Sequence, residues 1–142
     1  MLQKLRERSG SESGFTLVEL LVVMLILGIL AAIAIPSFFN QRDKARDADA
    51  KTQAKTAQTA IETYATENNG EYTAATAPRL QEIEETLNDA TLTVTAGADT
   101  YTVTAESDTG NTFSVSREAG GVMSLDCLAL GEAGCPEDGN WD

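Results

Sequence analysis

The sequence contains no histidine and only two cysteines among its 142 residues. Without an imidazole, histidine-based acid–base catalysis and histidine metal sites are excluded. Positive charge is also scarce, since 10 Lys and Arg residues stand against 22 Asp and Glu residues, for a formal net charge of −12. Nucleic acid is therefore not expected as the main partner, because neutralising phosphates requires a basic surface. The sequence also lacks a recognisable nucleophile–base pair and a phosphate-binding glycine loop, so we do not expect an enzyme.

The charges are unevenly distributed along the chain. All basic residues except Arg79 and Arg117 lie within the first 55 positions, whereas acidic residues continue to the end. This distribution predicts a stem of mixed charge followed by an acidic head. The simplest role of the acidic surface is solubility.

A long apolar run follows a short polar leader. Residues 1–14 are mostly polar, and from Phe15 to Ile35 the only polar side chains are Thr16 and Glu19. As a helix, about 21 residues span about 31 Å, close to the roughly 30 Å of a bilayer's hydrocarbon core. A removable secretory signal would have a shorter apolar region and a small-residue cleavage site. Residues 31–34 offer such a site, so that alternative remains open.

Glu19 is the exception within this run. A lone carboxylate inside an apolar segment costs on the order of 3 kcal/mol on insertion scales, so such a residue usually has a partner. Cutting the chain after Gly14 would create an α-amine on Phe15, one helical turn from Glu19. The partner would then be this amine or the amine of a neighbouring subunit. The alternative is a carboxylate that is protonated or hydrated near the membrane face.

The residues from Gly14 to Val23, Gly-Phe-Thr-Leu-Val-Glu-Leu-Leu-Val-Val, resemble the processing and methylation site of type IV prepilins and pseudopilins. The similarity continues to Pro36 and covers roughly the first quarter of the chain. The resemblance implies that a prepilin peptidase cuts between Gly14 and Phe15 and methylates the new amine of Phe15. It also implies that Glu19 serves subunit docking and that the apolar run is retained after cutting.

The same resemblance implies an architecture and a set of partners. The expected fold is α+β: a long N-terminal helix, transmembrane in its lower half, packed on a small antiparallel sheet, with no cofactor. The precursor would cross the inner membrane once. An assembly platform and its ATPase would then build identical subunits into an extracellular or periplasmic filament.

The stem divides into a membrane part, residues 15–36, and an upper part, residues 37–69. Gly28 and Pro36 interrupt the helical pattern, because proline lacks the amide hydrogen that a helix interior uses. They predict a segment able to loosen in a filament or, alternatively, an ordinary kink. The upper part reads as a helix that stops at Asn68-Asn69-Gly70.

One apolar stripe runs along the upper stem at helical spacing. Its members are Ala50, Ala54, Ala57, Ile61 and Tyr64. The charges around it have both signs, and Asp47 lies at helix-neighbour spacing from Lys44 and Lys51. We interpret these charges as a solvated face; the alternative is contact between stem cations and the acidic heads of adjacent subunits.

The head comprises residues 70–142. A connecting loop with one short helix, from Arg79 to about Asn88, precedes four segments in which apolar residues alternate with polar ones. Turns at 97–99, 108–111 and 118–121 separate these segments, which predicts an antiparallel meander with one apolar face. The apolar face must be covered, and the upper stem helix is the obvious candidate.

Cys127 and Cys135 lie close together near the C-terminus. In a cytosolic chain both would be free thiols, whereas an exported chain would favour a disulfide. The segment resembles the C-terminal disulfide loop of many pilins, which implies the pairing; closing it would contribute roughly 2.6 kcal/mol. The nearby carboxylates could offer oxygen ligands to calcium, as the resemblance to pseudopilins implies, but their spacing is not that of an EF-hand, and no metal site is predicted. Those carboxylates are Asp126, Glu137, Asp138 and Asp142.

Three functions follow from this reading. The first is a structural subunit of a type IV pilus. The second is a pseudopilin of a type II secretion or DNA-uptake system, which would share the processing but build a short periplasmic filament. The third is a monomeric, membrane-anchored binding module, in which Glu19 would have no role in assembly.

Overall fold

The computed structural model describes residues 14–142. A helix α1 (Leu17–Glu67) is followed by α2 (Ala77–Ile83), a 3₁₀ turn η1 (Glu85–Leu87) and four strands. The strands are β1 (Thr91–Ala96), β2 (Tyr101–Glu106), β3 (Thr112–Arg117) and β4 (Met123–Cys127). Two compact units meet inside α1, between Phe38 and Phe39. The predicted leader, residues 1–14, lies outside the described residues except for Gly14.

The first unit is the apolar half of α1. Its large side chains are exposed along the whole segment, from Leu17, which is 73% exposed, to Ile35, which is 53% exposed. By length and composition α1 is able to cross a membrane. A helix that is apolar on every side needs lipid or other apolar surface around it. We therefore expect lipid or other apolar helices to surround this half of α1.

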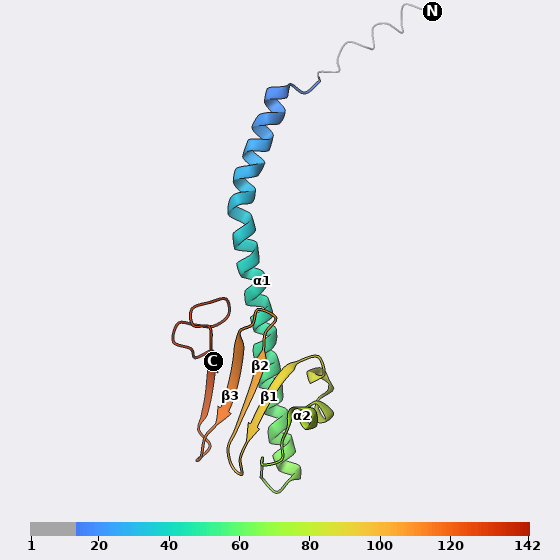
Figure 1. Ribbon diagram of the computed structural model, residues 1–142, viewed down its shortest axis with the longest axis vertical. Coiled ribbons are helices and arrows are strands. Elements are labelled where there is room, and N and C mark those ends of the chain that lie inside the picture. The colour runs from blue at the N-terminus through green and yellow to red at the C-terminus, as the bar shows by residue number, and fades with distance from the viewer. Residues whose placement is uncertain (1–13) are drawn as a thin grey trace, which may run out of the picture. The chain divides into compact units, whose positions relative to one another are not determined.

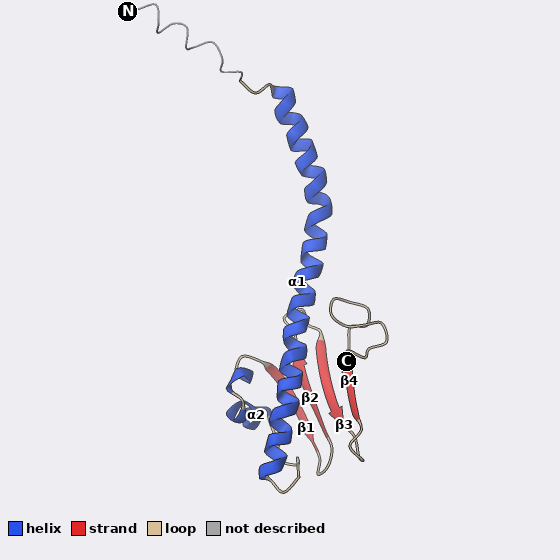
Figure 2. Cartoon of the chain, turned by 180° about the vertical axis from the view of Figure 1, so that it is seen from behind, coloured by secondary structure: helices blue, strands red, loops and turns tan. Residues whose placement is uncertain are grey.

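The second unit is the head, built on the other half of α1. Figures 1 and 2 show this part of the helix lying across one face of the four-stranded sheet. The helix ends after Glu67, where Asn69 and Gly70 take positive φ angles of 58° and 87°. The Gly70 amide donates to the Ala65 carbonyl, and this left-handed ending satisfies the last turn. The predicted helix stop is confirmed.

The predicted stripe is the surface that packs on the sheet. All five of its members are buried, and Ala54, Ala57 and Ile61 have no exposed surface. The small side chains come first along the helix and the larger Ile61 and Tyr64 follow, all within the same buried cluster as the residues of the sheet. The stripe therefore holds the head on the helix.

The sheet is an antiparallel meander in the order β1-β2-β3-β4. Its register aligns one apolar row across all four strands, Val94–Val103–Val115–Leu125. In β2 and β3 the residues on this face are buried, whereas Thr102, Thr104 and Ser114 alternate with them on the other face. The predicted α+β architecture, with one apolar sheet face covered by the helix, is confirmed.

The segment before the sheet differs in detail from the prediction. A single helix was expected from Arg79 to about Asn88, but α2 begins at Ala77, with Pro78 in its first turn, and ends at Ile83. Glu84 is extended, with φ −132° and ψ 98°, and a separate 3₁₀ turn follows. Leu80 and Leu87 are both buried. The break between the two helical segments lets each leucine reach the core. The spacing of Leu80, Ile83 and Leu87 fits one continuous helix equally well, so the sequence alone did not predict the break.

A carboxylate joins α1 to the strands near the end of the helix. Glu62 accepts hydrogen bonds from the hydroxyls of Tyr72 and Tyr101, both at 2.8 Å. Burial, together with the neighbouring Glu62 carboxylate, raises the pKa of Tyr101. The phenol therefore stays protonated and remains a donor to Glu62.

The interpretation of Asp47 as part of a solvated face is wrong. Asp47 is completely buried and accepts hydrogen bonds from Thr109 Oγ1 at 2.6 Å, Asn111 Nδ2 at 3.2 Å and the Gly134 amide at 2.9 Å. We call this set of contacts the Asp47 clasp. It connects α1 to the β2–β3 turn and to the C-terminal loop, so Asp47 serves the packing of the head instead of an ion pair with Lys44 or Lys51.

Glycine is required opposite this carboxylate. A Cβ atom at position 134 would lie 2.5 Å from the Cβ of Asp47, closer than two carbon atoms can approach. Burial by itself raises the pKa of Asp47, but hydrogen bonding with Thr109, the nearby Ser107 hydroxyl, Gly134 and Asn111 outweighs burial and lowers that pKa. The clasp therefore holds a carboxylate that stays ionised without a cation.

We expect Asp47→Asn to lower the free energy of unfolding of the head by about 1.5–3 kcal/mol, because a charged acceptor is lost and buried donors are left without a partner. Since the folded-state pKa is lowered, the stabilisation is present above the ordinary value of 3.8 and is lost as pH falls through the folded-state pKa. Urea unfolding of the full chain in micelles, followed by Trp141 fluorescence at about pH 7 and about pH 3, measures both effects.

Asp43→Asn is the matched control, because Asp43 lies one turn earlier on α1 and makes only an exposed 3.8 Å ion pair with Arg46. It should change the stability by less than about 0.5 kcal/mol. An Asp47→Asn variant as stable as wild type, with the same pH dependence, would contradict the role assigned to the clasp.

Candidate processing and assembly site

The predicted processing site lies just before the first turn of α1. Gly14, Phe15 and Thr16 precede the helix, which begins at Leu17. The Phe15 side chain is 80% exposed, and nothing in the described chain lies within 4 Å of the position where Gly14 would carry a Cβ atom. The peptide bond between Gly14 and Phe15 thus lies in a non-helical, uncrowded stretch of the described chain.

Thr16 and Glu19 together cap the start of α1. The Glu19 amide donates to Thr16 Oγ1 at 3.2 Å, and the Thr16 amide donates to Glu19 Oε2 at 3.4 Å. This reciprocal pair is a capping box, which satisfies two backbone donors that the first helical turn leaves unpaired. The negative charge of Glu19 also lies at the positive end of the helix dipole.

The capping box gives Glu19 a partner that the sequence interpretation did not consider. That interpretation weighed an amine in the same chain, an amine of a neighbour, or a hydrated carboxylate. The sequence signal was present, because Thr-x-x-Glu before an apolar run is the pattern of a capping box. Among the hydrogen bonds of residues 14–142, Glu19 uses its Oε2 atom, so the docking role predicted for Glu19 stays a prediction.

Gly28 and Pro36 do not interrupt α1, which is helical from Leu17 to Glu67. Proline at position 36 has no amide hydrogen to donate to the carbonyl four residues earlier. Beyond the adjacent helix backbone, nothing in residues 14–142 lies within 4 Å of a Cβ atom placed on Gly28, so crowding within the described chain does not explain that glycine. The loosening of this segment in a filament stays a prediction.

The two cysteines form the predicted disulfide, with a Cα–Cα distance of 5.8 Å. We call residues 127–135 the disulfide loop. It is fixed at several points: the Ala129 amide donates to Asn111 Oδ1 at 3.1 Å, and the Gly131 amide donates to the Pro136 carbonyl at 3.3 Å. Together with the Gly134 amide of the Asp47 clasp, these bonds hold the loop against the head.

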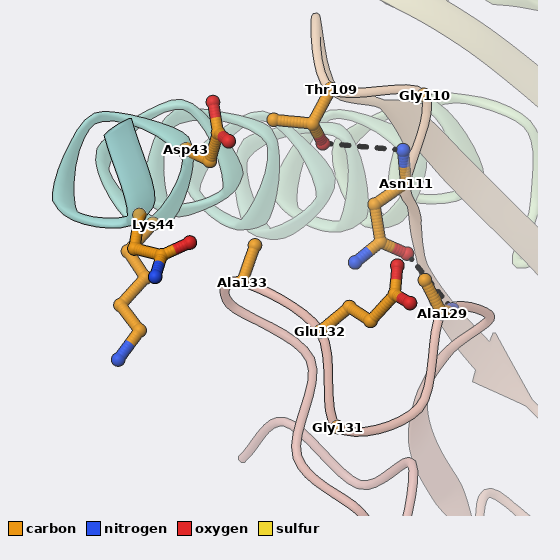
Figure 3. A pocket seen from close by; sticks show the side chains of 10 residues that line it. Asp43, Lys44, Thr109, Gly110, Asn111, Ala129, Gly131, Glu132 and Ala133 are labelled. Carbon is orange, nitrogen blue, oxygen red and sulfur yellow. Dashed lines mark hydrogen bonds between the residues drawn. The ribbon is translucent and has the colours of Figure 1, made fainter. Parts of the chain in front are cut away.

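A hollow of about 730 Å³ lies between α1, the β2–β3 turn and the disulfide loop. Asn40, Asp43 and Lys44 line it from α1, and Thr109–Asn111 line it from the turn; Ala129 and Gly131–Ala133 complete it. Figure 3 shows Glu132 near Asn111, with Lys44 extending away from the turn. Charged side chains of both signs line the broad opening of the hollow. Such a lining suits water and a charged or zwitterionic surface better than an apolar ligand.

The acidic residues weighed for calcium do not come together. Asp126 is exposed at the end of β4, and Asp138 accepts a hydrogen bond from the Asn140 amide. Within residues 14–142, no group of three or more Cys, Asp or Glu side chains is close enough to hold a metal ion.

Similarity to known proteins begins at this same N-terminal segment. Residues 10–35 match the family described as the prokaryotic N-terminal methylation motif. The chain is 33% identical over 104 residues to the type IV narrow pilus major component PilA5 of Thermus thermophilus, a match that covers 63% of this chain and 84% of that protein. The chain belongs to the type IV pilin and pseudopilin family.

Other relatives match shorter stretches of the chain. Identity is 45% over 56 residues with the type IV major pilin protein PilA of Myxococcus xanthus, covering 39% of this chain and 26% of that one. It is 42% over 57 residues with the type II secretion system core protein G of Pseudomonas aeruginosa, covering 40% of each chain. The chain thus spans well under half of these two relatives. No solved structure is significantly similar to it.

Both branches of this pilin and pseudopilin family are therefore represented among the relatives. The residues that match the methylation-motif family include the capping box and most of the apolar half of α1. The match to the pilus component of Thermus thermophilus, which covers 63% of this chain, is long enough to extend beyond α1 into the head.

We expect Thr16→Val to fray the first turn of α1, because it removes the hydroxyl that accepts from the Glu19 amide. The local cost should be about 0.5–2 kcal/mol, seen as faster hydrogen exchange at the Leu17–Leu20 amides of the chain in micelles. Thr16→Ser keeps the hydroxyl and should keep wild-type exchange. Equal exchange in the valine and serine variants would exclude a capping role for Thr16.

Proposed function

We propose that the chain is a structural subunit of a type IV pilus that is stored in a membrane and polymerised through its N-terminal helix. The observation that carries this proposal is the half of α1 whose apolar side chains are exposed on all sides. Membership of the pilin and pseudopilin family supports it, and so does the capped helix start at Thr16 and Glu19.

The physical argument begins with burial. An apolar helix half is stable in lipid, and it is equally stable inside a bundle of identical helices, because both environments remove it from water. The precursor would span the inner membrane once. Assembly would move the same surface from lipid into the centre of an extracellular filament, driven by a platform protein and its ATPase.

Processing gives the filament a defined end group. A prepilin peptidase would cut between Gly14 and Phe15 and methylate the new amine of Phe15. Glu19 would then supply the carboxylate that pairs with an amine during docking. The chain's role is structural and not enzymatic, which is consistent with relatives named as pilins and as a secretion-system core protein.

A pseudopilin is the second candidate, favoured by the 42% identity to the type II secretion system core protein G. It would share the membrane storage, the processing and the helix-driven assembly, and its filament would be periplasmic. A DNA-uptake pseudopilus is the related alternative. A monomeric membrane-anchored module is the third, and it differs in making no use of Glu19.

We expect the mature chain to begin at Phe15 with an extra methyl group on its amine. Intact-mass and N-terminal peptide mass spectrometry of the protein from native membranes measures both features. A Gly14→Ala variant tests the cut, because it adds a side chain directly beside the scissile bond and should accumulate as precursor. A mature chain that begins beyond Ala34 would exclude the retained helix and with it the filament.

The role of Glu19 in assembly is separable from its role in capping. Glutamine at the same position keeps the capping box, since Gln serves as well as Glu there, but it removes the charge. We expect Glu19→Gln to anchor normally and to keep a protected helix start while losing filaments. A hydrogen bond to a charged group is worth about 1.5–3 kcal/mol, which is roughly tenfold or more per subunit contact.

Glu19→Leu is the comparison variant, because it removes the cap and the charge while favouring insertion in lipid. Electron microscopy counts filaments, and membrane fractionation measures anchoring. Normal filaments from Glu19→Gln would show that the charge is not needed for assembly. Normal filaments from both variants would show an assembly that does not use Glu19, whereas a wild-type chain that forms no filaments would favour the monomeric module.

A further inference from the structure

One edge of the head's sheet is formed by β1, which pairs only with β2 (Figure 1). In an antiparallel ladder every second residue bonds to the neighbouring strand, and the residues between them turn their backbone groups to the other side. The Gly97 amide donates to the Thr100 carbonyl at 2.8 Å in the β1–β2 turn, which fixes this alternation along β1. The residues whose amides and carbonyls face away from β2 are Leu92, Val94 and Ala96.

The outward backbone groups of β1 have no partner in the head. Apart from the ladder with β2, no hydrogen bond in residues 14–142 joins the backbone of β1 to another element. The short helix α2 lies beside β1, and it does not bond to the strand either. Free donors and acceptors along an edge strand allow another strand to pair with it.

The opposite edge of the sheet is closed by the chain itself. The Cys127 amide donates to the Gly139 carbonyl at 2.9 Å, and the Trp141 amide donates to the Leu125 carbonyl at 3.4 Å. The C-terminal residues thus occupy the side of β4 that faces away from β3. Of the two edges of this sheet, β1 is the one left available to another strand.

The sequence of β1 lacks the features that keep edge strands from pairing. Natural proteins protect such edges with charged side chains, proline or a bulge. The sequence of β1 is Thr-Leu-Thr-Val-Thr-Ala, without charge or proline, and its register with β2 is continuous from Thr91 to Ala96. In a chain with a net charge of −12, this uncharged strand is a place where two copies can approach without strong repulsion.

We propose that β1 pairs with β1 of a second copy in antiparallel orientation, which joins the sheets of two heads into one. The register that engages all three outward residues places Val94 opposite Val94 of the second copy. Leu92 then lies opposite Ala96 on the apolar face, and Thr93 lies opposite Thr95 on the other face. Because Leu92, Val94 and Ala96 are only partly buried at the margin of the core, the pairing would cover them further.

Self-complementarity identifies the occupant of this edge as a second copy. The apolar row that runs from Val94 to Leu125 would continue across the contact into the second sheet. On the other face, threonine would meet threonine, a favourable cross-strand pair. Exposed side chains elsewhere on the head, such as Leu128 and Leu130 of the disulfide loop, define no comparable register.

The contact is small and twofold, which limits what it can do. A single pair of short strands is a smaller contact than the roughly 1,200 Å² that stable interfaces bury, so isolated heads would pair weakly. A twofold contact closes on itself and cannot build a stack, but it can join subunits of neighbouring filaments, where many weak contacts add up. The pairing involves the head alone; only this role between filaments rests on the proposed function.

Disulfide trapping in the full chain tests the register. Thr93→Cys and Thr95→Cys chains are purified in micelles, mixed and oxidised at high salt, which screens Asp89 of one copy from Asp99 of the other beyond the strand ends. In the proposed register positions 93 and 95 have Cα atoms about 4.5 Å apart, within reach of a disulfide. We expect several-fold more mixed dimers than dimers of either variant alone.

Thr104→Cys mixed with Ser114→Cys is the matched control, because these positions face each other on the same side of the sheet but lie away from its edge. This mixture should give few dimers. Peptide mass spectrometry locates each new disulfide and checks that the Cys127–Cys135 bond is intact. Association through the apolar half of α1 would raise all yields alike, so equal yields from every mixture would overturn the inference.

The same oxidation in native membranes and on filaments separates this inference from the proposed function. Filaments that form without any link between positions 93 and 95 would overturn the pairing and leave the filament subunit standing. Links in a chain that never forms filaments would support the pairing and remove its role between filaments. Links from β1 only to a different protein would assign the edge to another partner and overturn the pairing of copies.

Hydrogen exchange of the unaltered chain guards against effects of the substitutions. The amides of Leu92, Val94 and Ala96 should exchange rapidly in dilute micelles and several-fold more slowly at high chain concentration. The amides of Thr93 and Thr95, which bond to β2, should be protected at both concentrations. Exchange at the three outward amides that does not change with concentration would contradict the pairing.

Discussion

The close contact between the alanine stripe of α1 and the apolar face of the sheet is what the head depends on. Ala54 and Ala57 have no exposed surface, and they belong to the same buried cluster as Val103 and Val115 of the sheet. A methylene added at these positions would force the helix away from the sheet, which typically costs 1–3 kcal/mol. The other contacts in the head, including those of the disulfide loop, depend on this packing of the helix on the sheet.

Asp47 continues the same stripe, since it lies three residues before Ala50 on the buried face. At Asp47 the packing between α1 and the rest of the head changes from apolar to polar. A buried carboxylate without hydrogen bonds would be strongly unfavourable, so the β2–β3 turn and the disulfide loop must both close on it. The clasp thereby joins α1, the β2–β3 turn and the disulfide loop, which are far apart in the sequence, at the end of the head nearest to Asn40.

One helix serves two environments. Its first half is apolar all round and needs lipid or other copies, while its second half is amphipathic and finishes a water-soluble head. The change falls between Phe39 and Arg42, where charges begin. The capping box at Thr16 gives this long helix a defined start, so that the N-terminal segment proposed for processing and docking has a fixed geometry.

The sequence by itself determined the long helix, its stop at Asn69-Gly70, the four strands with their turns, the alanine stripe and the family resemblance, because each of these is a local pattern or a periodicity. It also contained the signal for the capping box, which the interpretation of Glu19 overlooked. Only the tertiary structure determined that Asp47 is buried. Its spacing from Lys44 and Lys51 is that of a solvated ion pair, and its burial depends on donors 62 to 87 residues away. The exposure of Leu128 and Leu130 was decided in the same way, because it follows from where the disulfide and the clasp hold the loop.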